Sequence, residues 1–175
     1  LEGDVAAAGS QGTLNVTTAA SVSDNDVTVT ASQDDTTITG TTSGDTVTAD
    51  AGAMGATDRL TLDGDADFVV TNAGSNLVVD ADGDGNSATP LQGTLNVTTD
   101  NGATGVTVLT GVDDTTLNTG TNSSGEVTVE ADELLNTTSV TNTLDINGSS
   151  KVTVNDLVAN VSGDGMDGAE LIVNT

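Results

Sequence analysis

The residues best suited to chemistry in this chain are aspartates that alternate along short stretches. Asp80, Asp82 and Asp84 directly precede Gly85, and alternating carboxylates on a tight turn can converge on one hard cation such as Ca2+. In a calcium-binding EF-hand the twelfth position of the loop is a bidentate glutamate, but here it is Leu91. The spacing therefore predicts a shorter calcium-binding turn and not an EF-hand. The alternative is that these aspartates are solvated turn residues.

A second candidate for a divalent cation site is formed by Asp63, Asp65 and Asp67. These residues have the same spacing, but they lie at the edge of an expected strand. Aspartate is a common turn former, and a chain this rich in aspartate contains such patterns by chance. The equivalent positions in the second half of the chain carry no carboxylate; they are Asn147, Ser149 and Lys151.

The sequence does not predict an enzyme. The chain contains no His and no Cys, which excludes nucleophilic triads in their common form. The acid pairs Asp34-Asp35 and Asp113-Asp114 consist of neighbouring residues, and neighbours on a strand point to opposite faces. A hydrolase with two carboxylates is chemically allowed, but Phe68 is the only aromatic residue that could hold a sugar. We interpret the acid pairs as turns that enter strands.

The charge of the chain indicates which partners it can have. It carries 27 acidic residues against Lys151 and Arg59, for a net charge of −25. Such a chain repels nucleic acid and anionic lipid, so divalent cations are the expected partners. It contains no apolar run of about 18 residues that would span a membrane, so we expect no membrane insertion.

An internal duplication organises the chain. The string QGTLNVTT occurs twice, DDTTI returns as DDTTL, and a third stretch returns in diverged form. Two copies of about 80 residues are in the length range of repeat architectures. Pro90 lies at the seam between them. We expect a flexible lead-in over residues 1–10, a first repeat over 11–91 and a second repeat over 92–175, preferably in one continuous structure.

The elements that would position these residues are short β-strands. Fifteen segments alternate β-branched or leucine residues with polar ones, and Gly, Asn, Asp and Ser lie between them. Two all-β folds fit: a parallel β-solenoid, or two tandem antiparallel β-sandwiches. The very short apolar runs and the near absence of aromatics favour the solenoid. The expected strands centre on residues 14–16, 27–29, 36–38, 46–48, 60–62, 68–70, 77–79, 95–97, 106–108, 116–117, 127–129, 144–146, 152–154, 158–161 and 171–173.

The composition and strings such as LNVTT (14–18 and 95–99) and VTVTA (27–31) resemble those of bacterial β-strand-repeat surface proteins. These include S-layer proteins, large secreted adhesins and their RTX-bearing relatives. The calcium-binding RTX nonapeptide GGxGxD does not occur in tandem, and its nearest echoes are at 80–85 and 163–168. The resemblance implies a structural protein that is secreted or displayed at the cell surface, often together with calcium.

The function expected from the sequence is structural and not enzymatic. We expect an extracellular protein that polymerises with copies of itself into a surface layer, fibre or adhesin stalk. The alternative is a calcium-dependent module that binds an adhesive ligand. A solenoid has strand edges at both ends, and such edges pair readily with other chains. The residues expected to carry the assembly lie in the first and last apolar strands: Leu14, Val16, Leu171, Ile172 and Val173.

Overall fold

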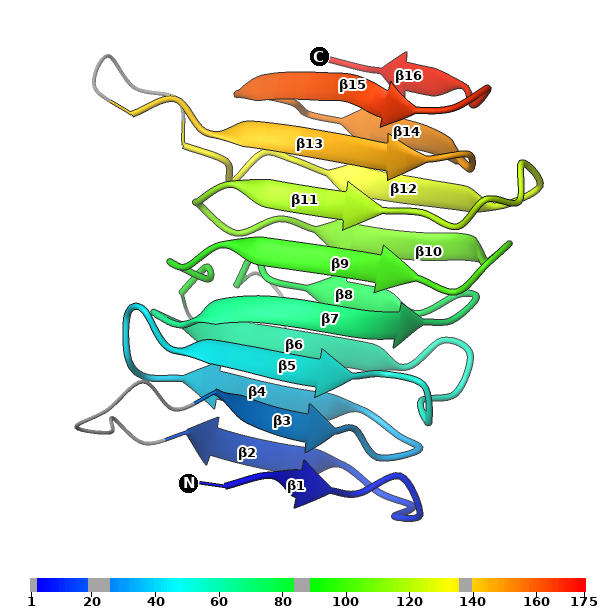
Figure 1. The fold of residues 1–175 in the computed structure, drawn as a ribbon. Coiled ribbons are helices and arrows are strands. Elements are labelled where there is room, and N and C mark those ends of the chain that lie inside the picture. Colours follow the sequence, from blue (N-terminus) through cyan, green and yellow to red (C-terminus); the bar gives the residue numbers. More distant parts are fainter. Residues whose placement is uncertain (1–2, 19–25, 84–88, 136–139) are drawn as a thin grey trace.

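The structure of the chain, a computed structural model, describes residues 3–18, 26–83, 89–135 and 140–175. In these residues the chain forms sixteen β-strands and no helix. Successive strands alternate between two eight-stranded sheets, which we call sheet A and sheet B. Each strand pairs in parallel with the strand two places further along the chain, so the chain winds as a parallel β-solenoid (Figure 1).

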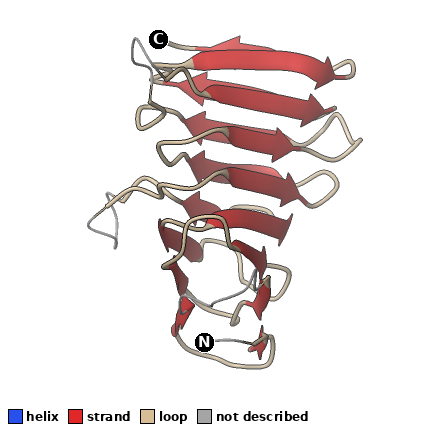
Figure 2. Ribbon diagram, turned by 60° about the vertical axis from the view of Figure 1, so that its left-hand side comes forward, coloured by secondary structure: helices blue, strands red, loops and turns tan. Residues whose placement is uncertain are grey.

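The odd-numbered strands form sheet A and the even-numbered strands form sheet B. Sheet A runs in the order β1 (Val5–Ala6), β3 (Val27–Thr30), β5 (Thr46–Asp50), β7 (Asp67–Ala73), β9 (Leu95–Thr99), β11 (Thr115–Asn118), β13 (Thr143–Gly148) and β15 (Asn160–Met166). Sheet B runs in the order β2 (Leu14–Thr18), β4 (Thr36–Gly40), β6 (Arg59–Gly64), β8 (Val78–Asp80), β10 (Thr104–Leu109), β12 (Glu126–Glu130), β14 (Lys151–Asn155) and β16 (Leu171–Val173). The two termini lie at opposite ends of the stack (Figure 2).

The period-two pattern of the sequence decides which side chains enter the core. In β14, Val152 and Val154 are buried while Lys151, Thr153 and Asn155 are more exposed. Threonine suits the outer positions because its β-branched side chain fits a pleated surface and its hydroxyl tolerates water. Most strands therefore contribute two or three hydrophobic side chains to a narrow interior, which explains how the protein folds almost without aromatics.

The parallel register stacks these inward side chains in columns along the solenoid. The columns consist mostly of aliphatic residues placed directly above one another, so the coils cover one another's apolar surface. In sheet B one column runs through all eight strands: Leu14, Thr36, Leu60, Val79, Val108, Val129, Val154 and Val173. In sheet A a second column contains Val5, Val29, Ala49, Val70, Val97, Leu117 and Ile146.

The fold confirms the solenoid prediction and excludes the two antiparallel sandwiches, because the described strand pairs are parallel. Each of the fifteen expected segments overlaps one of the strands β2 to β16. The strand that the pattern did not predict is β1, which lies within the expected lead-in. It pairs with Val29 and Thr30 of β3, and the amide of Ala7 donates to the carbonyl of Thr30 at 3.1 Å.

The two sequence copies form one continuous stack. Strand β9 of the second copy pairs with β7 of the first, and β10 pairs with β8. One cluster of buried hydrophobic residues extends from Val16 to Val154. Leu91, which follows Pro90 at the seam, is bound to the stack: its amide donates a hydrogen bond to the carbonyl of Ala81 at 2.9 Å.

The two sequence copies are offset by an odd number of strands. The string LNVTT forms β2 in its first occurrence and β9 in its second, seven strands later. Because the chain changes sheet at every strand, β2 lies in sheet B and its duplicate β9 lies in sheet A. The duplicated acid pairs likewise precede β4 in sheet B and β11 in sheet A. The second copy is therefore related to the first by a half-turn about the long axis.

One buried hydroxyl shows that the copies are not interchangeable. Inside the first copy, Thr36 Oγ1 lies 3.1 Å from the buried Ser32 Oγ, and the two hydroxyls share a hydrogen bond. The duplicate of Thr36 is Thr115, whose buried Oγ1 has no hydrogen-bond partner among the described residues. The duplicate of Ser32 is Gly111, where a Cβ would lie 2.6 Å from the carbonyl oxygen of Leu91. The neighbouring coil therefore leaves no room for the serine that would satisfy Thr115.

Candidate functional site: the open ends of the solenoid and its turn carboxylates

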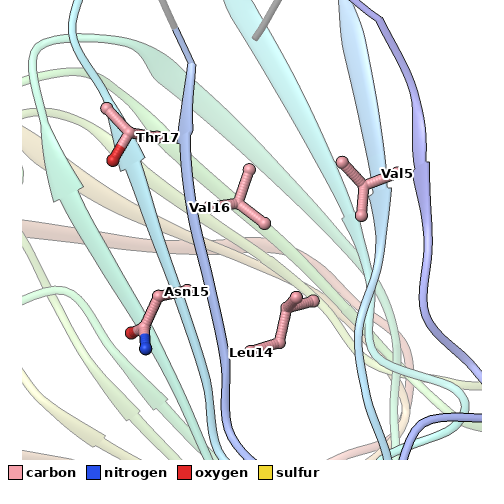
Figure 3. A pocket seen from close by; sticks show the side chains of 5 residues that line it. All are labelled: Val5, Leu14, Asn15, Val16 and Thr17. Atoms are coloured by element: carbon pink, nitrogen blue, oxygen red, sulfur yellow. The ribbon is translucent and has the colours of Figure 1, made fainter.

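The N-terminal end of the stack exposes the beginning of the core. Strands β1 and β2 are the edge strands of their sheets at this end, and no described strand pairs with their outer edges. Val5 and Leu14 are only partly buried, although Val29 and Thr36, which lie next to them in their columns, are fully buried. An open hollow of about 280 Å³ lies here, lined by Val5, Leu14, Asn15, Val16 and Thr17 (Figure 3). Two of the five predicted assembly residues, Leu14 and Val16, thus line this hollow.

The C-terminal end is open in the same way. Strands β15 and β16 stand last in their sheets, with no described strand beyond them. Leu171 and Ile172 are half-buried, and Val173 is 38% exposed although it ends the long column of sheet B. The other three predicted assembly residues therefore lie on the last coil, where apolar surface and strand edges face solvent together. Burying such surface is favourable, at about 25 cal/mol per Å².

A polar ladder also runs along the outside of the stack to this C-terminal end. The amide nitrogen of Asn155 donates to the Glu130 carboxylate at 2.9 Å, and that of Asn174 donates to the Asn155 amide oxygen at 2.9 Å. A similar ladder on sheet A joins Asn118 to Asn96 at 2.9 Å. Asparagine side chains thus link neighbouring coils wherever they occupy equivalent outward positions.

The structure gives Asp80, the first residue of the predicted calcium turn, a cationic partner. Asp80 is fully buried, and its Oδ2 accepts a hydrogen bond from Arg59 Nη1 at 2.5 Å. Its Oδ1 has no hydrogen-bond partner among the described residues. Asp82 is also buried, and Asp84 lies outside the described residues. The pattern did not indicate this ion pair, because Arg59 comes from the preceding coil.

The second predicted cation site is spread over a strand end and the following turn. Asp63 accepts a hydrogen bond from Thr89 Oγ1 at 3.2 Å, and Asp67 accepts two from Thr94, both at 2.8 Å. Asp65 is exposed between them. Among the described residues, no three ligand atoms of Asp63, Asp65 and Asp67 lie within 4.8 Å of one another. The structure thus does not bring this set together, and calcium binding stays a prediction.

Three carboxylates that were not grouped from the sequence do lie together, but they accept hydrogen bonds from backbone amides at turns. Oxygens of Asp34, Asp35 and Asp58 lie within 4.8 Å of one another. Asp35 accepts from the backbone amide of Arg59 at 2.9 Å, and Asp58 accepts from that of Gly55 at 2.6 Å. Since these oxygens already accept backbone hydrogen bonds and are largely exposed, the cluster is explained as turn structure.

The same role recurs along the chain and explains part of its acidity. A carboxylate just before or at the start of one strand accepts a hydrogen bond from an amide within one residue of the start of the strand above it. The pairs, from carboxylate to amide, are Asp4 to Thr28, Asp35 to Arg59, Asp67 to Thr94 and Asp114 to Thr143, at 2.7 to 2.9 Å. Such a bond satisfies an amide at the edge of a turn, much as a capping residue does at a helix end.

Comparisons with protein-family models, curated proteins and solved structures give no significant match to this chain. The described part of the chain contains no helix that is long and apolar enough to cross a membrane. The candidate site is therefore described by geometry alone: strand edges without a partner in the described residues at β1, β2, β15 and β16, with a stack of columns, ladders and turn carboxylates between them.

Proposed function

We propose that this chain is a structural module of a secreted or surface-exposed protein, and that its copies associate end to end into a fibre, layer or stalk. The observation that supports the proposal is that, among the described residues, the outer edges of β1, β2, β15 and β16 have no strand partner. Each end leaves two strand edges and the apolar end of the core facing solvent. Unpaired edges and exposed apolar surface both favour association with another chain.

Both ends present one strand edge of sheet A and one of sheet B, which supports association of a second copy and not of an unrelated partner. Sixteen strands are an even number, so a copy placed on the C-terminal end brings its β1 beside β15 in sheet A and its β2 beside β16 in sheet B. All four strands run in directions that allow parallel pairing, as in the rest of the stack. The association is polar, and it repeats without a limit on length.

The net charge of −25 sets the conditions under which association occurs. Copies that approach end to end repel each other, and the last coil itself carries Asp164, Asp167 and Glu170. Salt shortens the range of this repulsion to about 8 Å at physiological ionic strength. Association is therefore expected to rise with ionic strength, and divalent cations are expected to act more strongly than sodium at equal ionic strength.

The test compares the full chain with a variant that lacks residues 170–175. Light scattering and negative-stain images of the full chain are expected to show rods that lengthen with concentration and salt. The truncated variant removes β16 and is expected to keep its β-sheet circular dichroism while remaining monomeric. A full chain that stays monomeric at every concentration and salt level, or a truncated variant that still polymerises, contradicts the proposal.

A further inference from the structure

One flank of the solenoid carries a patch of exposed hydrophobic residues. In the part of the chain that the structure describes, only four large hydrophobic side chains are well exposed. Three of them are Leu135, Val140 and Val158, with exposed fractions of 44%, 46% and 49%. All three lie in connections that cross from sheet B to sheet A, and these connections follow one another on the same flank (Figure 1). Apolar surface that is gathered in this way marks interaction sites, whereas single scattered residues do not.

Hydrogen bonds hold three successive connections side by side. The amide of Leu135 donates to the carbonyl of Val112 at 3.0 Å, and the Asn142 side chain donates to the same carbonyl at 2.6 Å. The amide of Asn160 donates to the carbonyl of Asn142 at 3.2 Å. Val112 is itself half-buried. The patch, which we call the apolar corner, consists of Val112, Leu135, Val140 and Val158.

The duplication shows that the stack does not need these hydrophobic residues. Counted from the repeated strands, three of the four positions have a counterpart in the first copy that is polar or a glycine. The pairs, second copy to first, are Val112 and Gln33, Leu135 and Gly55, and Val158 and Gly74. The backbone follows the same course at the last pair, because Asp156 and Asn72, two residues earlier, both have positive φ, 51° and 57°. The first copy thus stacks without an apolar corner, so the corner serves something other than the stack.

The same connections are acidic. The carboxylates that they carry are those of Asp113, Asp132, Glu133 and Asp156. The chain has only two cations, and neither lies at this corner. Arg59 pairs with Asp80, and Lys151 stands at the opposite end of β14, beside Glu126. The apolar corner is therefore surrounded by negative charge and has no cation of its own.

This charge decides which partner fits. A second copy would bring the same carboxylates to the contact, in a chain whose net charge is −25, and like charges across an interface oppose binding. Nucleic acid and anionic lipid are repelled for the same reason. We propose that the apolar corner binds a short segment of another protein in which aliphatic residues are flanked by Lys or Arg. The proposed end-to-end association is not needed for this inference.

The size of the corner fits a peptide segment. Three neighbouring coils span about 10 Å, which is the length of about three residues of an extended chain. Within that length the aliphatic side chains of a segment reach Leu135 and Val158, and basic side chains on either side reach Asp132 and Asp156. The apolar contact supplies affinity, while the charges select the partner and speed its association.

Three short synthetic peptides test the proposal by isothermal titration calorimetry on the full chain. One alternates leucine and lysine, the second alternates serine and lysine, and the third alternates leucine and glutamate. At physiological ionic strength, where general attraction is screened beyond about 8 Å, the leucine–lysine peptide should bind at least about tenfold more tightly than either other peptide. Equal affinity for the serine–lysine peptide would mean general attraction to an acidic chain, and equal affinity for the leucine–glutamate peptide would remove the role of charge. Either result overturns the proposal.

Variants of the chain locate the binding. Leu135→Ser and Val158→Ser should each weaken binding of the leucine–lysine peptide by roughly tenfold. Val173→Ser, which removes the exposed valine outside the corner, should leave that affinity unchanged. The double variant Asp132→Asn/Asp156→Asn should weaken binding roughly threefold or more relative to Asp26→Asn/Asp65→Asn, which lowers the charge equally at other exposed positions. Circular dichroism should show the same fold throughout, because all of these side chains are exposed.

Two results would place the binding elsewhere or assign another occupant. If Val173→Ser weakens peptide binding as much as Leu135→Ser does, the peptide does not bind at the corner. If Leu135→Ser or Val158→Ser lowers self-association in light scattering, the corner is covered by a second copy. Both results overturn the proposal, and neither contradicts association of copies as such.

Discussion

The ion pair between Arg59 and Asp80 makes the sharpest prediction about stability. Replacing Arg59 by Met keeps most of the aliphatic stem and removes the guanidinium. Asp80 is fully buried, and its other oxygen already lacks a partner among the described residues. The variant therefore leaves a buried carboxylate with no hydrogen bond from a cation. Removing one partner of a buried pair generally costs about 3–5 kcal/mol.

The exposure of Arg59 places the expected cost at the lower end of that range. Its side chain is 36% exposed, so water screens part of the attraction that is lost. We expect a loss of about 3 kcal/mol, which is a large part of a typical stability of about 5–15 kcal/mol. For a chain of this length that corresponds to a fall in Tm of roughly 6–12 °C.

The chain supplies its own control, because Lys151 is its other cation. Lys151 lies 3.5 Å from Glu126, and both side chains are well exposed, at 38% and 62%. Lys151→Met should therefore cost less than about 1 kcal/mol. Adding Asp80→Asn to Arg59→Met removes the buried charge and should recover part of the loss.

Urea unfolding followed by far-ultraviolet circular dichroism measures all of these variants, since the chain has no Trp or Tyr for fluorescence. If Arg59→Met costs no more than Lys151→Met, the pair does not stabilise the fold in the way its burial indicates. If the added Asp80→Asn recovers nothing, the loss comes from packing and not from charge.

Three further predictions follow from named contacts. Thr115→Val should leave the free energy of unfolding unchanged or raise it by about 1 kcal/mol, because it removes an unsatisfied buried hydroxyl. The same change at Thr36 should lower it by about 1–3 kcal/mol. Equal changes for the two variants in urea unfolding would contradict the difference between the copies. Asp114→Ala should cost about 1 kcal/mol, because it removes the acceptor for the first amide of the next coil, and the amide proton of Thr143 should exchange faster with solvent. Calcium should raise Tm beyond matched sodium chloride if it binds the predicted turn; Asp82→Asn/Asp84→Asn should remove the excess, and identical melting curves with calcium, chelator and salt would contradict a specific site.

The fold was predictable because its signal is local. Each strand from β2 to β16 carries its own alternation of apolar and polar residues, and short strands without aromatics favour a narrow stacked core. Strand β1 escaped prediction because Val5 and Ala6 stand in a run of small residues with no alternation. Its strand character comes from pairing with β3, which is a tertiary contact.

The candidate sites were less predictable because they depend on neighbours in other coils. The spacing of Asp80 and Asp82 indicates a cation-binding turn, but it cannot reveal that Arg59, one coil earlier, forms an ion pair with Asp80. In the same way the acid pair before β11 could be recognised as a turn, while its bond to the coil above could not. The place of Leu14, Val16, Leu171, Ile172 and Val173 in the end strands could be predicted from their order in the sequence, and their role in assembly stays a prediction.

The offset of seven strands between the two copies has a consequence for how such a stack can grow by gene duplication. Seven strands amount to three and a half coils, or a rise of about 17 Å, and each added copy is turned by half a revolution. A patch that arises by mutation in the ancestral unit therefore reappears on the opposite flank after the next duplication. Growth by gene duplication thus repeats the same surface features alternately on two opposite flanks of the stack.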